Sequence, residues 1–307
     1  MVEEINYKSN DGKNFIHAVK WLPEGEPKYI LQIAHGMAEH IMRYEDFAKF
    51  LNRHGFLVCG EDHLGHGKTA ANKADLGYCA EKNGYQTVLK DMKKLQDTIK
   101  QDYPKLPYFL LGHSMGSFLC RGFIETYGET LDGAIVMGTG NQPKIALAFA
   151  KFLCRLIAIF KGWRHRSNSI NNLAVGGYNK RFQPIVTGHE WLCRDDKQAT
   201  RYQNDPYCGY VFTLNGFFNM FDLMSFIENK KNINNIPKNL PVFICAGEQD
   251  PVGDFGYAPK VVNKSYIKAG IKDVTLKLYP EDRHEILNEF DQDVVYDDIL
   301  QWLIKHA

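Results

Sequence analysis

Residues 105–118, KLPYFLLGHSMGSF, decide the fold of this chain. A short apolar run, Tyr108 to Leu111, ends in the pattern Gly-x-Ser-x-Gly, and apolar residues at helical spacing follow from Phe118. This order predicts a strand, a sharp turn carrying Ser114 and a helix, which is the arrangement of a nucleophile elbow. Glycine at positions 112 and 116 lacks the side chain that would keep the strand and the helix from closing around so tight a turn.

The rest of the chain alternates between apolar runs of strand length and segments with helical periodicity. Besides the run before Ser114, strands are expected at 15–22, 29–34, 56–59, 134–137, 242–246 and 274–278. Helical spacing separates several of these runs, as at 88–99. Such alternation predicts an α/β fold class with a mainly parallel central sheet flanked by helices.

The alternation stops between residues 141 and 236, where Phe, Trp and Tyr are frequent. We expect a helical cap at 141–236, inserted between a first part of the core at 1–140 and a second part at 237–307. Two patterns predict helix starts within the cap: the capping box 187–190 and the pair Asp205-Pro206.

One helix of the expected cap carries a long apolar stripe: Ile145, Phe149, Phe152, Leu156 and Ile159. One interpretation of the whole insertion is a helical layer whose apolar stripes simply pack on the sheet domain. In another, the cap roofs an apolar pocket over Ser114, and one helix face can do each job. A transient contact with a membrane or micelle is a third interpretation.

An acid and a histidine follow the last two expected strands. Asp250, followed by Pro-Val-Gly, is better placed to turn inward than Glu248 or Asp254, and His284 lies on the loop after 274–278. A serine hydroxyl becomes a nucleophile when a histidine takes its proton and an acid orients the imidazole. The order Ser114, Asp250, His284 therefore predicts a catalytic triad.

The loop HGMAEH, residues 35–40, directly follows an early strand. Hydrolases with a nucleophile elbow take one backbone donor of the oxyanion hole from a loop after an early strand, so the N–H of Met37 is the candidate here. Glu39 and Arg43 stand four residues apart, which is typical of an ion pair on a helix surface. The same pair could instead hold the polar part of a substrate.

Five blocks occur in order along most of the chain: His35-Gly36-x-x-Glu39-His40-x-x-Arg43-Tyr44, Asp62-x-x-Gly65-His66-Gly67, Gly112-His113-Ser114-Met115-Gly116, Gly247-x-x-Asp250-Pro251-Val252 and Arg283-His284-Glu285-x-x-Asn288-Glu289. Together they resemble the monoacylglycerol lipase and lysophospholipase branch of the α/β-hydrolases, also labelled serine aminopeptidase-like. The resemblance implies an α/β-hydrolase fold with a helical cap, and an oxyanion hole made by the N–H groups of Met37 and Met115. It also implies an alcohol site near Glu39 and Arg43. Met37 departs from the smaller residue that such lipases often carry there.

Composition excludes several other classes of protein. A net charge of +1 gives no reason to expect a nucleic acid partner. Seven cysteines, an odd number without a CxxC pair, indicate reduced thiols. His63 and His66 stand near an acid but lack a convincing fourth ligand, so no metal and no cofactor is expected. Neither a signal peptide nor an apolar stretch of membrane-spanning length is apparent, so we expect a soluble, cytoplasmic protein.

These observations predict a serine hydrolase that cleaves carboxylic esters with an apolar acyl chain through an acyl-enzyme. The expected partner is a small ester or a lipid such as a monoacylglycerol or lysophospholipid, and no signal for an oligomeric state is present. Aromatic cap residues would bury the acyl chain: Phe149, Phe152, Trp191, Phe217, Phe218 and Phe221. The alternatives are a peptidase or amidase with the same triad, and a non-catalytic α/β-hydrolase that serves as a ligand receptor.

Overall fold

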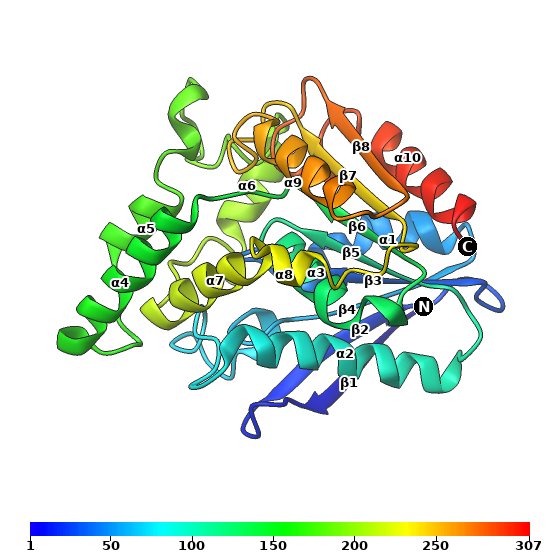
Figure 1. Cartoon of the computed structure of the whole chain (residues 1–307), viewed down its shortest axis with the longest axis horizontal. Helices are drawn as coiled ribbons and strands as arrows, with labels where there is room; N and C mark the ends of the chain where they lie inside the picture. Colours follow the sequence, from blue (N-terminus) through cyan, green and yellow to red (C-terminus); the bar gives the residue numbers. More distant parts are fainter.

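One sheet of eight strands forms the centre of the computed structural model, which describes all 307 residues (Figure 1). The strands lie in the order β1-β2-β4-β3-β5-β6-β7-β8; those from β4 to β8 are parallel, and β1 and β2 are antiparallel to their neighbours. The expected α/β fold class with a mainly parallel sheet is thus confirmed. The strands are β1 (Val2–Lys8), β2 (Phe15–Trp21), β3 (Tyr29–Ala34), β4 (Phe56–Glu61), β5 (Tyr108–His113), β6 (Gly133–Met137), β7 (Val242–Gly247) and β8 (Val274–Tyr279).

Helices bury both faces of the sheet and build an apolar core under each layer. Helices α2 (Gly84–Asp102), α3 (Met115–Tyr127) and α9 (Tyr257–Lys268) cover one face, and α1 (Glu45–Asn52) and α10 (Gln292–Lys305) cover the other. Strands β4, β5 and β7 are consequently buried along their whole length. This explains why their sequences are nearly continuous apolar runs.

The edge strand β1 is absent from the sequence-based prediction. It pairs only with β2, and its residues alternate between exposed and half-buried positions. Ile5 and Tyr7 are its apolar residues that pack against the core. Because one face of this strand is solvated, apolar and polar residues alternate along it. A search for continuous apolar runs, which finds the central strands, therefore does not detect it.

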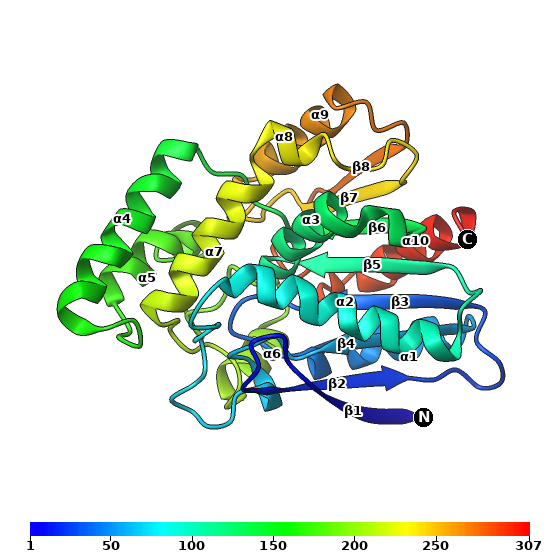
Figure 2. The same cartoon turned by 60° about the horizontal axis from the view of Figure 1, so that its bottom comes forward.

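Five helices lie between β6 and β7 in the sequence, and we call residues 141–236 the cap. They are α4 (Lys144–Lys161), α5 (Asn168–Ala174), α6 (Asp196–Asn204), α7 (Leu214–Ile227) and α8 (Lys230–Ile233). Helix α7 packs on α3, and α4 packs on α7, so α4 and α5 form the edge of the molecule at the left of Figures 1 and 2. No helix of the chain has both the length and the apolar content needed to cross a bilayer.

The apolar stripe of α4 faces solvent. Its buried face consists of Leu147, Ala150, Cys154 and Ala158. The stripe from Ile145 to Ile159 instead has side chains that are 42 to 86% exposed. The interpretation that the apolar stripes of the cap pack on the sheet domain therefore holds for α7, which packs on α3, and is wrong for this stripe of α4. Periodicity predicts the helix correctly, but both of its faces are apolar, and the pattern does not tell which one is buried.

Both helix starts expected within the cap are wrong. No helix begins at Thr187; the Glu190 carboxylate instead accepts hydrogen bonds from the N–H groups of Val186, Thr187 and Gly188 and closes a turn. Asp205 follows the end of α6 rather than opening a helix. The residue before a proline is driven towards extended backbone, and Asp205 has φ −79° and ψ 123°.

One buried guanidinium meets the chain near both ends of the cap. Arg121 of α3 is fully buried and donates a hydrogen bond to the Gly140 carbonyl (2.9 Å), directly before the cap. It also pairs with Glu228 (3.0 Å), which follows α7. The helix that follows Ser114 therefore holds the entry and the exit of the cap through a single side chain.

Glu125, one turn further along α3, is buried near Arg121 and hydrogen-bonds to no group of the chain. Burial raises the pKa of its carboxyl from 4.5 to about 9, although the charge of Arg121 acts in the opposite direction. At pH 8 the folded protein keeps this proton and the unfolded chain releases it. The group therefore lowers the free energy of unfolding progressively as the pH rises from about 4.5, the ordinary pKa of the carboxyl, to about 9, its pKa in the folded protein.

We expect Glu125→Gln, which mimics the protonated acid, to raise the unfolding temperature by a few degrees at pH 8 and by less at pH 5. Differential scanning calorimetry at the two pH values checks this. An equal rise in unfolding temperature at pH 5 and at pH 8 would mean that the carboxyl is not protonated in the folded protein.

Candidate active site

The turn between β5 and α3 has the strained geometry of a nucleophile elbow. Ser114 has φ 56° and ψ −120°, a conformation that L-residues rarely adopt, and it separates the end of β5 from the start of α3. A Cβ atom at Gly112 would collide with the carbonyl of Gly116, and one at Gly116 would collide with the carbonyl of Ala34. The two glycines are therefore required by close backbone contact, as the sequence pattern predicts.

The structure brings Asp250 and His284 together. Asp250 is fully buried beyond β7, where its Oδ1 accepts a hydrogen bond from the Val252 N–H (2.8 Å). Its Oδ2 lies 2.9 Å from Nδ1 of His284, on the loop after β8. Glu248 is only half-buried and Asp254 is exposed, and neither is paired with a histidine.

His284 and Ser114 line the same cavity. The imidazole is 2% exposed, and its Nε2 hydrogen-bonds to no group of the chain. With Nδ1 facing Asp250, Nε2 is the nitrogen left to exchange a proton with a serine hydroxyl. The three residues predicted as a triad thus lie in one site, with a buried acid behind the histidine.

Two backbone N–H groups flank the elbow. The Met115 N–H opens α3, where the first amides of a helix have no partner inside the helix and carry its positive dipole. The Met37 N–H lies on the loop after β3 and donates to no backbone group. Two cap groups, the Tyr202 hydroxyl and the Gly209 N–H, each donate to the Ala38 carbonyl at 3.0 Å and fix this loop. Met37 and Met115 both line the cavity with Ser114.

Glu39 and Arg43 form a buried ion cluster rather than a pair on a helix surface. Arg43 pairs with the Glu39 carboxylate and donates two further hydrogen bonds to Glu285 at 2.7 and 2.8 Å. Burial acts to raise the pKa of Glu39, but the guanidinium of Arg43 and the imidazole of His113 hold it well below its ordinary value. Both carboxylates are therefore charged, and both contact the single guanidinium of Arg43.

Of this cluster, the carboxylates line the cavity and the guanidinium does not. Glu39 and Glu285 are among the lining residues, whereas Arg43 lies behind them. Glu39 also accepts hydrogen bonds from the Gly36 N–H and from the Tyr44 hydroxyl (2.9 Å). The predicted binding residue Arg43 thus reaches the cavity only through its partners, and the sequence analysis misses Glu285 in this cluster.

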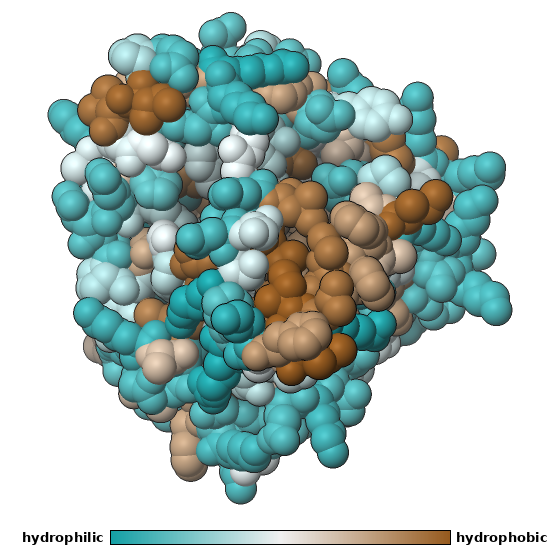
Figure 3. Space-filling view, turned by 90° about the vertical axis from the view of Figure 1, so that its left-hand side faces the viewer, coloured by the Kyte–Doolittle hydropathy of each residue, from teal (hydrophilic) through white to brown (hydrophobic).

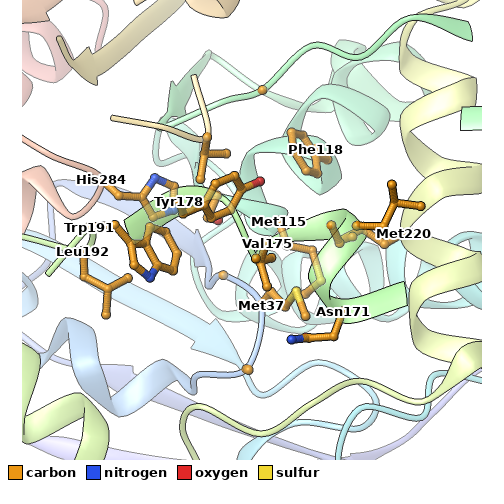
Figure 4. A pocket seen from close by; sticks show the side chains of 18 of the residues that line it. Met37, Met115, Phe118, Asn171, Val175, Tyr178, Trp191, Leu192, Met220 and His284 are labelled. Atoms are coloured by element: carbon orange, nitrogen blue, oxygen red, sulfur yellow. The ribbon is translucent and has the colours of Figure 1, made fainter. Parts of the chain in front are cut away.

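The cavity has a volume of about 460 Å³ and lies between the sheet and the cap (Figure 4). Its apolar wall is built by the elbow region, the segment after α5, the loop before α6, and α7: Met115, Phe118, Val175, Tyr178, Trp191 and Met220. The polar side chains Glu39 and Glu285 stand in the same cavity. The site therefore combines an apolar chamber with a polar corner.

Half of the aromatic residues expected around an acyl chain line this cavity. Phe149, Trp191 and Phe221 do so, but Phe152 points to solvent and Phe217 is buried in the core. The remaining one, Phe218, packs edge-on against Trp163 instead. Val175 and Tyr178 are missed because they flank a Gly-Gly loop, where no periodic signal marks the lining side.

The histidines 63 and 66 lie in a buried cluster with His35, with ring centroids 4.2 to 6.2 Å apart. Burial lowers the pKa of His35 to about 3 and that of His63 to about 4, so both are neutral near pH 7. The one set of possible metal ligands whose atoms lie within 4.8 Å of one another is His40, Asp205 and Cys208. There Nε2 of His40 lies 3.0 Å from Asp205, a hydrogen bond that links the loop after β3 to the cap.

Comparison with known proteins agrees with this geometry. Residues 25–291 match the model of the family described as serine aminopeptidase, S33. The chain is 32% identical to the human monoglyceride lipase over 311 residues, covering 99% of this chain and 92% of that protein. It is 25% identical to the monoacylglycerol lipase of Mycolicibacterium smegmatis, covering 99% and 97%.

Among solved structures, a thermostable carboxyl esterase from Bacillus coagulans, crystallised with glycerol, is similar to the chain. The TM-score is 0.92 at 32% identity, and the match covers 99% of this chain and 98% of that one. The five sequence blocks, the elbow, the cap between β6 and β7 and these matches lead to one conclusion. The chain belongs to the serine aminopeptidase (S33) family of α/β-hydrolases, and within it to the relatives of monoglyceride lipase.

Proposed function

We propose that this protein is a serine hydrolase that cleaves carboxylic esters of the monoacylglycerol type. The observation that carries the proposal is the cavity, in which an apolar chamber and two carboxylates meet beside Ser114 and His284. The names of its relatives, which include a monoglyceride lipase and a carboxyl esterase bound to glycerol, support the same substrate class. The cytoplasmic location expected from the sequence stays a prediction.

In the proposed mechanism His284 takes the proton of the Ser114 hydroxyl as the oxygen attacks the ester carbonyl. The negative charge that develops on the carbonyl oxygen is stabilised by the N–H groups of Met37 and Met115, each worth about 3 kcal/mol. The C–O bond then breaks, and the alcohol leaves with the proton held by His284. A water molecule attacks the resulting acyl-enzyme by the same route, while Asp250 stabilises the imidazolium in both steps.

The polar corner supplies acceptors for hydroxyl groups. Glu39 and Glu285 are lining residues of the cavity, and the hydroxyls of a glycerol moiety would donate hydrogen bonds to their carboxylates. The two carboxylates carry one negative charge more than Arg43 neutralises. The choice of a polyol ester over an aminoacyl substrate, the alternative that the family description raises, therefore rests on the apolar chamber and on the names of the relatives.

We expect kcat/KM for p-nitrophenyl esters to rise by about fourfold per added methylene, since each buried methylene contributes about 0.8 kcal/mol. The rise should stop when the chain fills the cavity. A medium-chain monoacylglycerol should be turned over faster than an aminoacyl amide at equal enzyme and pH. Faster cleavage of the amide, or no dependence on acyl length, would favour the peptidase alternative.

We further propose that the cap contacts membranes or micelles. Figure 3 shows apolar side chains gathered on the face that is formed by the cap. Members of this surface, which we call the cap patch, are exposed by 54 to 86%: Ile145, Phe152, Ile159, Phe160, Leu173, Ile185 and Val186. Exposed apolar side chains that gather on one face are typical of an interaction site, and lipid substrates are presented at the surface of a membrane or micelle.

Phe160→Ser should lower binding to phosphatidylcholine vesicles and the rate on vesicle-borne monoacylglycerol by severalfold. The rate on soluble p-nitrophenyl acetate should not change, because Phe160 does not line the cavity. Phe15→Ser is the matched control, since Phe15 is 65% exposed on the core rather than on the cap. Equal losses in both variants would contradict a role of the cap patch.

A further inference from the structure

Five residues of the cap lie against the loop that carries His284. We call residues 190–194 the clamp and residues 282–285 the histidine loop. The Glu285 N–H donates to the Leu192 carbonyl at 2.6 Å, and the His284 N–H donates to the Trp191 carbonyl at 3.4 Å. From the histidine loop, the Arg283 guanidinium donates to two clamp carbonyls, at 2.6 and 3.2 Å. The two segments are therefore joined through their backbones, although about 90 residues separate them in sequence.

A cluster of ion pairs lies at the last residue of the clamp, Arg194. The Arg194 guanidinium contacts Asp282 (2.7 Å), Glu289 (2.8 Å) and Asp291, and the Glu289 carboxylate also accepts from the backbone N–H of Arg194 and of Arg283. Asp282 and Glu289 are fully or almost fully buried. Losing the guanidinium would leave buried carboxylates without their cation, directly beneath the histidine loop.

The clamp also supplies a side chain that covers the imidazole. The ring of Trp191 lies 5.1 Å from that of His284 at an angle of 34°, and the His113 ring lies 4.6 Å away. Figure 4 shows the indole beside His284, with Tyr178 next to it. Trp191 is itself held, because its backbone N–H donates to the Asn179 side-chain oxygen at 2.9 Å and its ring packs against Tyr178.

We propose that the clamp positions His284 for proton transfer, so that this part of the cap belongs to the catalytic machinery. The inference rests on the proposed function of His284 as the base. The backbone N–H groups of His284 and Glu285 hydrogen-bond to the clamp and to no other backbone group. Without the clamp, two buried donors would lose their partners and the histidine loop would be free to shift. A displacement of about 1 Å from the reactive geometry costs on the order of a hundredfold in rate.

The clamp therefore has a different role from the rest of the cap. Helices α4 and α7 only shape the cavity, whereas the clamp, whose Trp191 and Leu192 also line it, fixes a reacting group. Variants of clamp residues that do not line the cavity should accordingly act on kcat, and variants of α4 and α7 in the cavity wall should act on KM and on acyl-length preference.

The first test uses Arg194, which does not line the cavity and so has no contact with substrate to lose. Arg194→Ala should lower kcat for p-nitrophenyl butyrate by about tenfold or more with KM within about twofold, and Arg194→Lys should lower it less. Arg201→Lys is the matched control, on an exposed cap residue that makes no contact with the histidine loop. An unchanged kcat in Arg194→Ala, or a change in KM alone, would overturn the proposal.

The second test uses Trp191, with p-nitrophenyl acetate as a substrate too short to fill the cavity. Trp191→Ala should lower kcat and the rate of fluorophosphonate labelling by the same factor, and Trp191→Phe should restore most of both. Trp163→Ala, an indole of the same cap packed on Phe218, should leave them unchanged. If Trp163→Ala and Trp191→Ala have equal effects, general stability of the cap explains the result and the clamp does not.

The Ser114→Ala variant separates the positioning role of the clamp from the proposed function itself. If Ser114→Ala keeps full activity, the proposed function is wrong whatever the clamp variants do. If Ser114→Ala is inactive but the clamp variants keep the kcat of the unmodified protein, only the positioning role is wrong. Melting temperatures of all variants, measured in parallel, separate loss of kcat from loss of folded protein.

Discussion

Ser114→Ala should lose ester hydrolysis by about six orders of magnitude in kcat and should no longer react with a fluorophosphonate probe. The expected loss in kcat is this large because serine and histidine act as one unit. Without either of them, no acyl-enzyme can form. The strained backbone at residue 114 supports the assignment, since φ of 56° in a non-glycine residue is costly and persists where a side chain must be presented to a reactant. Activity assays and intact-mass labelling check both effects on the same sample.

The matched control is Ser169→Ala, which removes an exposed serine of the cap and should change neither measurement. The strained turn is not expected to unfold in the variant, because alanine keeps the Cβ that already fits there. Labelling of a serine other than Ser114 would show that the nucleophile has been misassigned.

Asp250→Asn should lower kcat by about four orders of magnitude while the protein remains folded. The carboxylate that lies 2.9 Å from Nδ1 of His284 fixes the tautomer in which Nε2 is free to accept the serine proton. An amide in its place can present an N–H to Nδ1, which selects the opposite tautomer, and it no longer stabilises the imidazolium. Rates in the presence of saturating ester, together with circular dichroism, measure the effect.

Glu248→Gln and Asp254→Asn serve as controls, since they neutralise the two other acids near the end of β7. Both should retain nearly full kcat, because one side chain is half-buried away from the histidine and the other is exposed. If either variant loses most of its kcat while Asp250→Asn stays active, the triad acid is not Asp250.

The sheet and the order of the proposed triad could be predicted because each depends on short-range patterns. Strands buried on both faces read as apolar runs, and the elbow needs a strand, a glycine-framed serine and a helix within residues 108–118. Asp250 and His284 follow from their places after strands, since parallel strands end at the same edge of a sheet. The edge strand β1 could not be predicted in this way, because one of its faces is exposed and the other only half-buried.

The partners of the charged residues could not be predicted, because they are distant in sequence. The i,i+4 spacing of Glu39 and Arg43 indicates their pairing correctly, but Glu285 joins them from 242 residues away. Burial of the cluster is likewise invisible in a pattern that is usual on exposed helices. The same limit applies to the cap, where aromatic content predicts an apolar cavity but not which of Phe149, Phe152 and Phe217 would face it.

The place of Arg121 has a consequence for exchanging caps between relatives. A chimaera joined at residues 141 and 236 would keep Arg121 in the recipient and take residue 228 from the donor. If the donor lacks an acid there, the guanidinium stays buried without its anion, a loss that typically costs about 3 to 5 kcal/mol. Such a hybrid would fail through misassembly rather than through substrate mismatch. Moving the second junction to residue 228, so that the recipient's own Glu228 is retained, would allow specificity to be transplanted with the fold intact.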